Sequence, residues 1–126
     1  MSRSPSPTLT PAELRVMQAL WNVGPAPASV IIAELGPGRG TRDSTVRTIL
    51  RILERKGYVK HKVQGRAFVY HAAVAERDAQ RGAVRDLITR FFSSSPERLV
   101  LTLLRHNDVT PAELRRLRRL VDEDKS

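Results

Sequence analysis

The residues with the clearest chemical potential lie between positions 42 and 66. This stretch holds eight Lys/Arg and two Asp/Glu, and its first part, RDSTVRTILRILERKG, mixes arginines with serine and threonines. Guanidinium and hydroxyl groups donate hydrogen bonds to phosphates and to base edges in a DNA groove. A charged helix face is usually only solvated, but this excess of one sign favours binding of a polyanion.

The other reactive side chains do not form a pattern typical of an enzyme. His61, His71 and His106 are far apart and share no carboxylate cluster with metal-ligand spacing. The sequence contains no cysteine, no glycine-rich phosphate loop and no nucleophile elbow. We therefore expect no enzymatic activity, no catalytic residue, no metal site and no cofactor.

The basic stretch coincides with a predicted helix over residues 44–56 that has two different faces. Its apolar face follows the i, i+3, i+4, i+7 template and consists of Val46, Ile49, Leu50 and Leu53. Asp43 or Ser44 could cap the start of this helix, and Gly57 could end it. The opposite face carries the hydrogen-bond donors.

The polar face divides into two groups, because recognition helices enter the major groove by their N-terminal ends. The expected base-reading residues are Ser44, Thr45, Arg47, Thr48 and Arg51. The expected contacts to the DNA backbone are Arg42, Arg55, Lys56, Lys60, Lys62 and Arg66. For Ile52, contact with a thymine methyl group and packing against the following strands both stay open.

The elements around this helix predict a small mixed fold. TPAELR at Thr10–Arg15 can form a capping box that starts a helix, which Gly24-Pro25 ends. PAPASVIIAELGPG predicts a shorter helix, and YVKHKV and AFVYHA predict a β-hairpin of undetermined register. Three helices and a hairpin are the outline of a winged helix-turn-helix.

The C-terminal third predicts three more helices. SSSP at 93–96 interrupts the first of them, RLVLTLL at 98–104 is a helix or a core strand with the helix favoured, and a second TPAELR at 110–115 starts the last. Three short helices cannot bury all their apolar positions, so we expect a second copy to cover them; folding over the winged domain is the alternative. The expected dimer-interface residues are Leu87, Phe91, Leu99, Leu103, Leu114, Leu117, Leu120 and Val121.

Composition sets the domain organisation. The chain has 126 residues, of which 40% are hydrophobic, and a net charge of +9; residues 1–71 hold 11 Lys/Arg and 4 Asp/Glu, against 11 and 9 in residues 72–126. We predict a disordered leader at 1–8, a winged-helix DNA-binding domain at 9–72 and a helical dimerisation domain at 73–126. Because the sequence has no signal-peptide or transmembrane pattern, we expect a soluble, cytoplasmic protein that does not bind membranes.

Several motifs together resemble the penicillinase repressor family, which includes the bla, mec and copper-responsive repressors. They are Leu9-Thr10, Ala12-Glu13, Val16-Met17, Leu20-Trp21, Ser44–Thr48, Leu53, Lys56–Val59 and Gly65–Tyr70. The resemblance implies a homodimeric bacterial transcriptional repressor in which a winged helix binds a palindromic operator in duplex DNA and a helical domain holds the dimer. A winged-helix scaffold for protein partners, without specific DNA binding, is the alternative.

The sequence also departs from this family. Thr102-Leu103 stands where antibiotic-responsive members are cleaved between Asn and Phe, the C-terminal cysteines of copper-responsive members are absent, and Ile52 replaces a common Arg. The inducing signal, and any upstream sensor or protease, therefore stay open.

Overall fold

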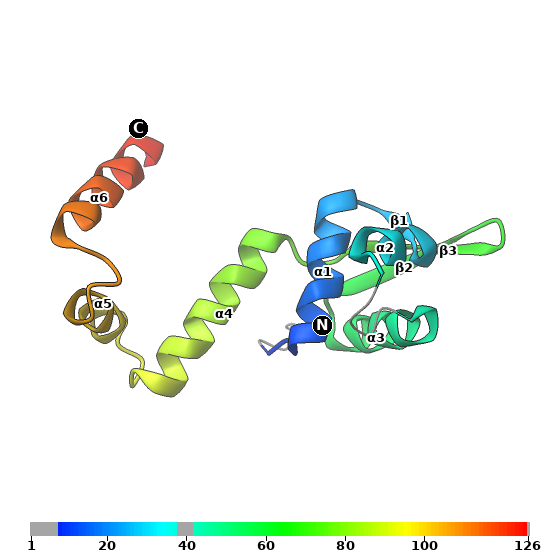
Figure 1. Cartoon of the computed structure of the whole chain (residues 1–126), viewed down its shortest axis with the longest axis horizontal. Coiled ribbons are helices and arrows are strands. Elements are labelled where there is room, and N and C mark those ends of the chain that lie inside the picture. The colour runs from blue at the N-terminus through cyan, green and yellow to red at the C-terminus, as the bar shows by residue number, and fades with distance from the viewer. Residues whose placement is uncertain (1–7, 38–41, 126) are drawn as a thin grey trace. The chain divides into compact units, whose positions relative to one another are not determined.

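The computed structural model describes residues 8–37 and 42–125, which form two units, residues 1–83 and 84–126. The first contains α1 (Pro11–Val23), β1 (Ala26–Pro27), α2 (Ala28–Leu35), α3 (Asp43–Lys56), β2 (Val59–Gln64) and β3 (Ala67–Ala72). Helix α4 (Glu76–Phe91) begins in this unit and continues into the second, where α5 (Pro96–Arg105) and α6 (Pro111–Lys125) follow (Figure 1). The predicted fold class, mainly α with a small hairpin in a winged helix-turn-helix, is confirmed.

Helix α1 starts as its sequence predicts. Thr10 Oγ1 accepts a hydrogen bond from the backbone N–H of Glu13 at 3.1 Å, and Glu13 Oε1 accepts one from the N–H of Thr10 at 2.9 Å. Pro11 occupies the first turn, where a missing N–H costs nothing. Gly24 ends the helix with a φ of +82°, a conformation that residues with a Cβ rarely adopt.

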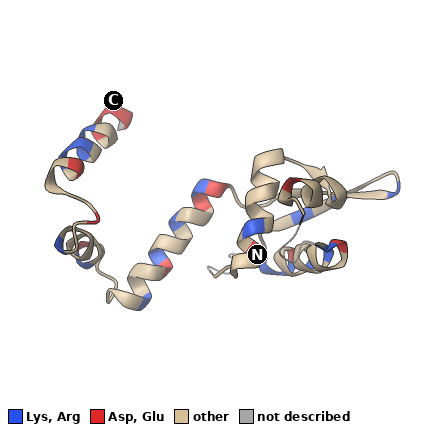
Figure 2. Cartoon of the chain, in the orientation of Figure 1, with Lys and Arg blue, Asp and Glu red and all other residues tan. Residues whose placement is uncertain are grey.

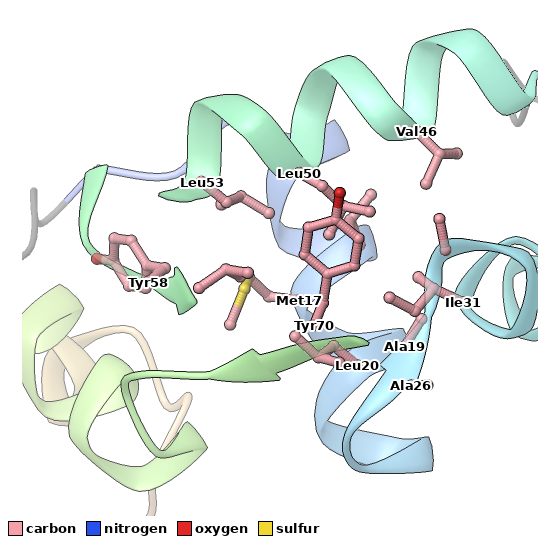
Figure 3. Packing of buried hydrophobic residues seen from close by; sticks show 13 residues of the cluster. Met17, Ala19, Leu20, Ala26, Ile31, Val46, Leu50, Leu53, Tyr58 and Tyr70 are labelled. Carbon is pink, nitrogen blue, oxygen red and sulfur yellow. The ribbon is translucent and has the colours of Figure 1, made fainter. Parts of the chain in front are cut away.

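The core of the first unit lies between α1, α2, α3 and the sheet. Met17, Ile31, Leu50 and Leu53 are completely buried there, and Figure 3 shows them packed around the ring of Tyr70. Each comes from the apolar face of its helix, so packing of these faces fixes how the three helices sit together. The polar face of α3 is thereby turned outward.

The sheet is antiparallel with the order β1-β3-β2. Gln64 pairs with Ala67, which leaves Gly65 and Arg66 as a two-residue turn. Gly65 has a φ of +63°, as expected for glycine at the first position of a type II′ hairpin turn. The hairpin of β2 and β3, here called the wing, extends beyond the helices of this unit (Figure 1).

Two local predictions need correction. Strand β1 pairs Ala26 with Tyr70 and Pro27 with Val69, although the sequence had suggested no strand there; proline is tolerated because β1 is an edge strand. Neither Asp43 nor Ser44 caps α3: Arg42 holds the N-cap position, without a side-chain cap bond. Gly57 ends α3 as expected, with a φ of +92°.

The second unit consists of amphipathic helices without an enclosed core. RLVLTLL is helical, as favoured, and Ser95 caps α5 by accepting from the N–H of Arg98 at 3.3 Å. The second TPAELR forms the same capping box as the first, with Thr110 Oγ1 accepting from the N–H of Glu113 at 3.1 Å. Among the described residues from 84 to 124, none is buried.

Three further expectations concern the leader, the domain boundary and the absence of membrane-spanning helices. Residues 1–7 of the expected leader lie outside the described residues. The expected boundary at 72/73 falls at the end of β3 and stays a prediction. In the part of the chain that the structure describes, no helix has the length and apolar character needed to span a bilayer.

Candidate nucleic-acid interface

Helix α3 presents its predicted polar face to solvent. Val46, Leu50 and Leu53 are at most 1% exposed. The five predicted base-reading residues are all exposed: Ser44, Thr45, Arg47, Thr48 and Arg51. Thr48 Oγ1 donates to the carbonyl of Ser44 at 2.9 Å, so this hydroxyl already has an acceptor inside the helix. Figure 2 shows that Lys and Arg positions, in blue, occur along α3 and at the end of the wing.

Five of the six predicted backbone-contact residues are exposed: Arg42, Arg55, Lys60, Lys62 and Arg66. Lys62 lines a different hollow from Arg47 and Arg66, together with Trp21 and His71. In residues 8–37 and 42–125, no ion pair to an acidic side chain engages the five exposed residues. Their charges are therefore available to a polyanion, and their positive sum favours one.

Lys56 is an exception. Its Nζ lies 2.7 Å from Glu13 Oε1 and donates to the carbonyl oxygen of Thr8 at 3.2 Å, and its side chain is only 27% exposed. This ion pair joins the end of α3 to the start of α1. We therefore leave Lys56 out of the DNA interface proposed below, and infer that it stabilises the fold.

The Lys56 contact also determines the charge of a buried carboxylate. Burial alone raises the pKa of Glu13, but hydrogen bonds from Lys56 and Thr10 and the attraction of Lys56 outweigh burial and hold this pKa below its ordinary value. The nearby phenol of Tyr58 responds oppositely, because burial and then the negative charge of Glu13 raise its pKa. Glu13 is thus an ionised residue at 5% exposure, and its charge is compensated by Lys56.

A groove of about 370 Å³ separates α3 from the wing. Its lining residues are Pro27, Ala28, Ser29, Arg47, Arg66, Ala67 and Phe68. Arg47 and Arg66 thus line one concave surface, although 19 positions separate them in the sequence. Two cations on the walls of a groove suit a phosphate or a base edge.

Five residues of this groove were not among the predicted DNA contacts: Pro27, Ala28, Ser29, Ala67 and Phe68. Ser29 lies at the start of α2, and its place beside Arg47 depends on how α2 and α3 pack. Phe68 had a detectable signal, because a large apolar residue two positions after the wing turn has no place in the core. It is 48% exposed, and its cross-strand partner Val63 is 65% exposed. The wing therefore carries an apolar surface beside Arg66.

His61 links the wing to α3. Its Nδ1 lies 2.7 Å from Glu54 Oε1, and its ring stacks on Phe68 with centroids 4.3 Å apart and planes inclined by 19°. Within the described part of the chain, no group of three or more His, Cys, Asp and Glu side chains could hold a metal ion. In this structure His61 packs and bonds to neighbouring side chains.

The expected dimer-interface residues leave apolar surface uncovered in the single chain. Leu99 and Leu103 are half-buried. The others are more exposed: Leu87, Phe91, Leu114, Leu117, Leu120 and Val121, with Phe91 reaching 69%. The prediction omitted Val84, Val100 and Leu101, which are exposed as well; their spacing on α4 and α5 was the available signal.

Comparison with known proteins gives a consistent result. A family model described as "Penicillinase repressor" matches residues 9–123. The chain is 28% identical to the penicillinase repressor of Bacillus licheniformis (95% of this chain, 94% of the relative). It is 26% identical to the methicillin resistance regulatory protein MecI of Staphylococcus aureus (91% and 94%).

A solved structure matches as well. The solution structure of monomeric BlaI from Bacillus licheniformis in complex with the blaP half-operator is 32% identical in sequence to this chain. The match covers 62% of this chain and 93% of that one, with a TM-score of 0.50.

Proposed function

The chain belongs to the penicillinase repressor family, and we propose that it represses transcription as a homodimer bound to a palindromic operator. That it is a DNA-binding repressor and not an enzyme follows from the family, whose named relatives are repressors and regulatory proteins. We propose three further points: that the protein is a homodimer, that its operator is palindromic, and which residues read the bases. Acting on operator DNA, the protein would work in the cytoplasm.

The observation that carries the proposal is the position of α3 beside the wing. The exposed face of α3 fits the major groove, which admits an α-helix, and Arg47 and Arg51 can each bridge guanine O6 and N7. Arg66, which lines the same groove as Arg47, would then contact the backbone. The BlaI structure supports this use of the fold, since it is a complex with the blaP half-operator.

The exposed apolar residues of the second unit support the homodimer. When a partner covers the exposed leucines along one stripe of a helix, apolar surface leaves water and the free energy falls. A second copy is the expected partner, because helix-turn-helix proteins commonly read two half-sites with two subunits. The proposal includes no cleavage at residues 102–103, where Thr102-Leu103 replaces the Asn-Phe of the antibiotic-responsive members.

The deciding experiment selects bound sequences from a random pool of DNA duplexes. We expect a palindrome, whose two halves are spaced by one or more turns of DNA. Selection of a single half-site would refute the dimeric reading. No enrichment of any sequence, together with a stable protein partner in pull-down, would favour the scaffold alternative.

Two substitutions test the reading helix. Arg47→Ala and Arg51→Ala should each weaken specific binding by about 1 to 3 kcal/mol if the arginine makes a bidentate base contact. Arg15→Ala is a matched control, because Arg15 is an exposed arginine on α1 and outside the groove. Specific binding that survives both substitutions would refute α3 as the reader.

A further inference from the structure

Phe68 is contacted on one side by His61 and lines the DNA-facing groove with Arg47 and Arg66. From this arrangement we propose that His61 is a positioning residue, which braces the wing against α3 through Glu54 and Phe68 and thereby sets operator affinity. The proposal rests on the proposed operator binding, and extends it to residues that need not touch DNA.

The first link of the brace joins two elements. Glu54 belongs to α3 and His61 to β2, and their side chains approach to 2.7 Å. Glu54 follows Arg47 by seven positions, or about two helical turns, so the two residues lie on the same side of α3. The wing is therefore attached to the side of α3 that carries a predicted base reader.

The second link joins the ring of His61 to the aromatic side chains of β3. His61 stacks on Phe68 at 4.3 Å and lies 5.9 Å from the ring of Tyr70, whose side chain is 8% exposed and part of the core. Phe68 and Tyr70 themselves meet edge to face at 6.4 Å. The exposed ring of Phe68 is thus connected through His61 to a buried ring and to α3.

In this proposal the connection holds the wing in place beside α3. Arg47 of α3 lines the groove together with Arg66 and Phe68 of the wing. A wing that moved freely would have to be ordered when DNA binds, and that ordering lowers affinity. The brace orders the wing in advance, so its loss should weaken binding even if every DNA-contacting side chain remains.

The test measures operator affinity for Glu54→Ala, His61→Ala and the double variant. We expect each single variant to bind about fivefold more weakly, and the double variant no more weakly than either, as for residues acting together. The direction in which Glu54→Ala changes operator affinity is decisive. Removing a carboxylate near DNA should tighten binding by charge alone, so weaker binding supports the brace and tighter binding overturns it.

Two further variants separate positioning from folding. His61→Gln keeps a hydrogen-bond donor for Glu54 and should recover part of the operator affinity that His61→Ala loses, while urea unfolding measures the stability of each variant. His106→Gln removes a histidine outside the wing and should bind like the wild type. If the wild type binds an operator and His61→Ala, folded as stably as the wild type, binds it equally tightly, the brace is refuted. If the wild type binds no operator, the proposed function itself fails.

Discussion

The two units treat their apolar residues in opposite ways. In the first, one apolar face of each of α1, α2 and α3 converges on one interior, and Met17, Ile31, Leu50 and Leu53 lose all contact with water. In the second, α5 and α6 have equally regular apolar stripes, yet the described residues from 84 to 124 include no buried side chain. Similar helices therefore end in a closed core in one unit and in an open surface in the other.

This difference indicates where each unit obtains its stability. A closed core is stabilised by contacts within one chain, so its stability does not depend on protein concentration. An open surface of leucines is stabilised only when something covers it, so its stability depends on the concentration of the partner. The first unit would thus serve DNA reading, and the second would serve assembly.

The strongest test of this comparison places a charge on α6. Leu117→Asp and Leu120→Asp together should shift the protein to monomer, because burying an unpaired carboxylate in an apolar interface is strongly unfavourable. Losing the second DNA-binding unit should lower operator affinity by about a hundredfold or more. Sedimentation velocity and operator titration measure the two effects. Arg115→Asp, also on α6 but outside the leucine stripe, is the control, and an unchanged dimer in the leucine variant would remove α6 from the interface.

A second prediction compares truncations in the two units. Leu50→Ala should lower the free energy of unfolding by about 3 kcal/mol at every protein concentration, because it leaves a cavity in a closed core. Leu101→Ala, at a leucine that is 44% exposed in the single chain, should have an effect that grows as the protein is concentrated. Chemical denaturation at several concentrations distinguishes the two, and equal behaviour would contradict the division between closed and open units.

The third prediction concerns the ion pair inside the closed unit. Lys56→Met should cost about 2 kcal/mol at pH 7, because the buried carboxylate of Glu13 loses its cation. The folded-state pKa of Glu13 is lowered, so its stabilising contribution is present above the ordinary value of 4.5 and is lost as pH falls through the lowered pKa.

The pH dependence supplies the control for this variant. The difference in unfolding free energy between wild type and Lys56→Met should shrink on acidification, as Glu13 becomes protonated below its ordinary pKa of 4.5. Urea unfolding at pH 7 and pH 3.5 measures it. A difference that is the same at both pH values would mean that Lys56 stabilises the fold by packing and not through Glu13.

The same contrast explains which features the sequence could predict. TPAELR predicted the start of α1, and the spacing of Val46, Leu50 and Leu53 predicted the buried face of α3, because caps and periodicity are local properties. Because the buried face of α3 could be identified, the remaining polar residues could be predicted to be exposed donors. Their contacts to DNA stay predictions.

Features that depend on packing could not be predicted in this way. Lys56 reaches Glu13 across 43 positions, and β1 exists only because β3 lies beside it. His61 and Glu54 are close in sequence, but their contact requires the turn from α3 into β2. The sequence shows that these residues are charged or favour strands. Only the tertiary structure determines which residues they contact.

The smallest predicted effects compare the two copies of TPAELR. Both form the same capping box, so Thr10→Ala and Thr110→Ala should each cost about 1 kcal/mol, while Thr→Ser at either position keeps the cap and should be nearly neutral. Thr10→Ala should lower stability at all concentrations and leave the dimer constant unchanged, because α1 belongs to the closed core. Thr110→Ala should instead weaken the dimer by about 2 kcal/mol, or about thirtyfold, because α6 gains its stability from the partner and each dimer has two copies of the cap. A dimer constant that Thr110→Ala leaves unchanged would show that α6 is stable on its own, and the contrast between the units would then begin after α5.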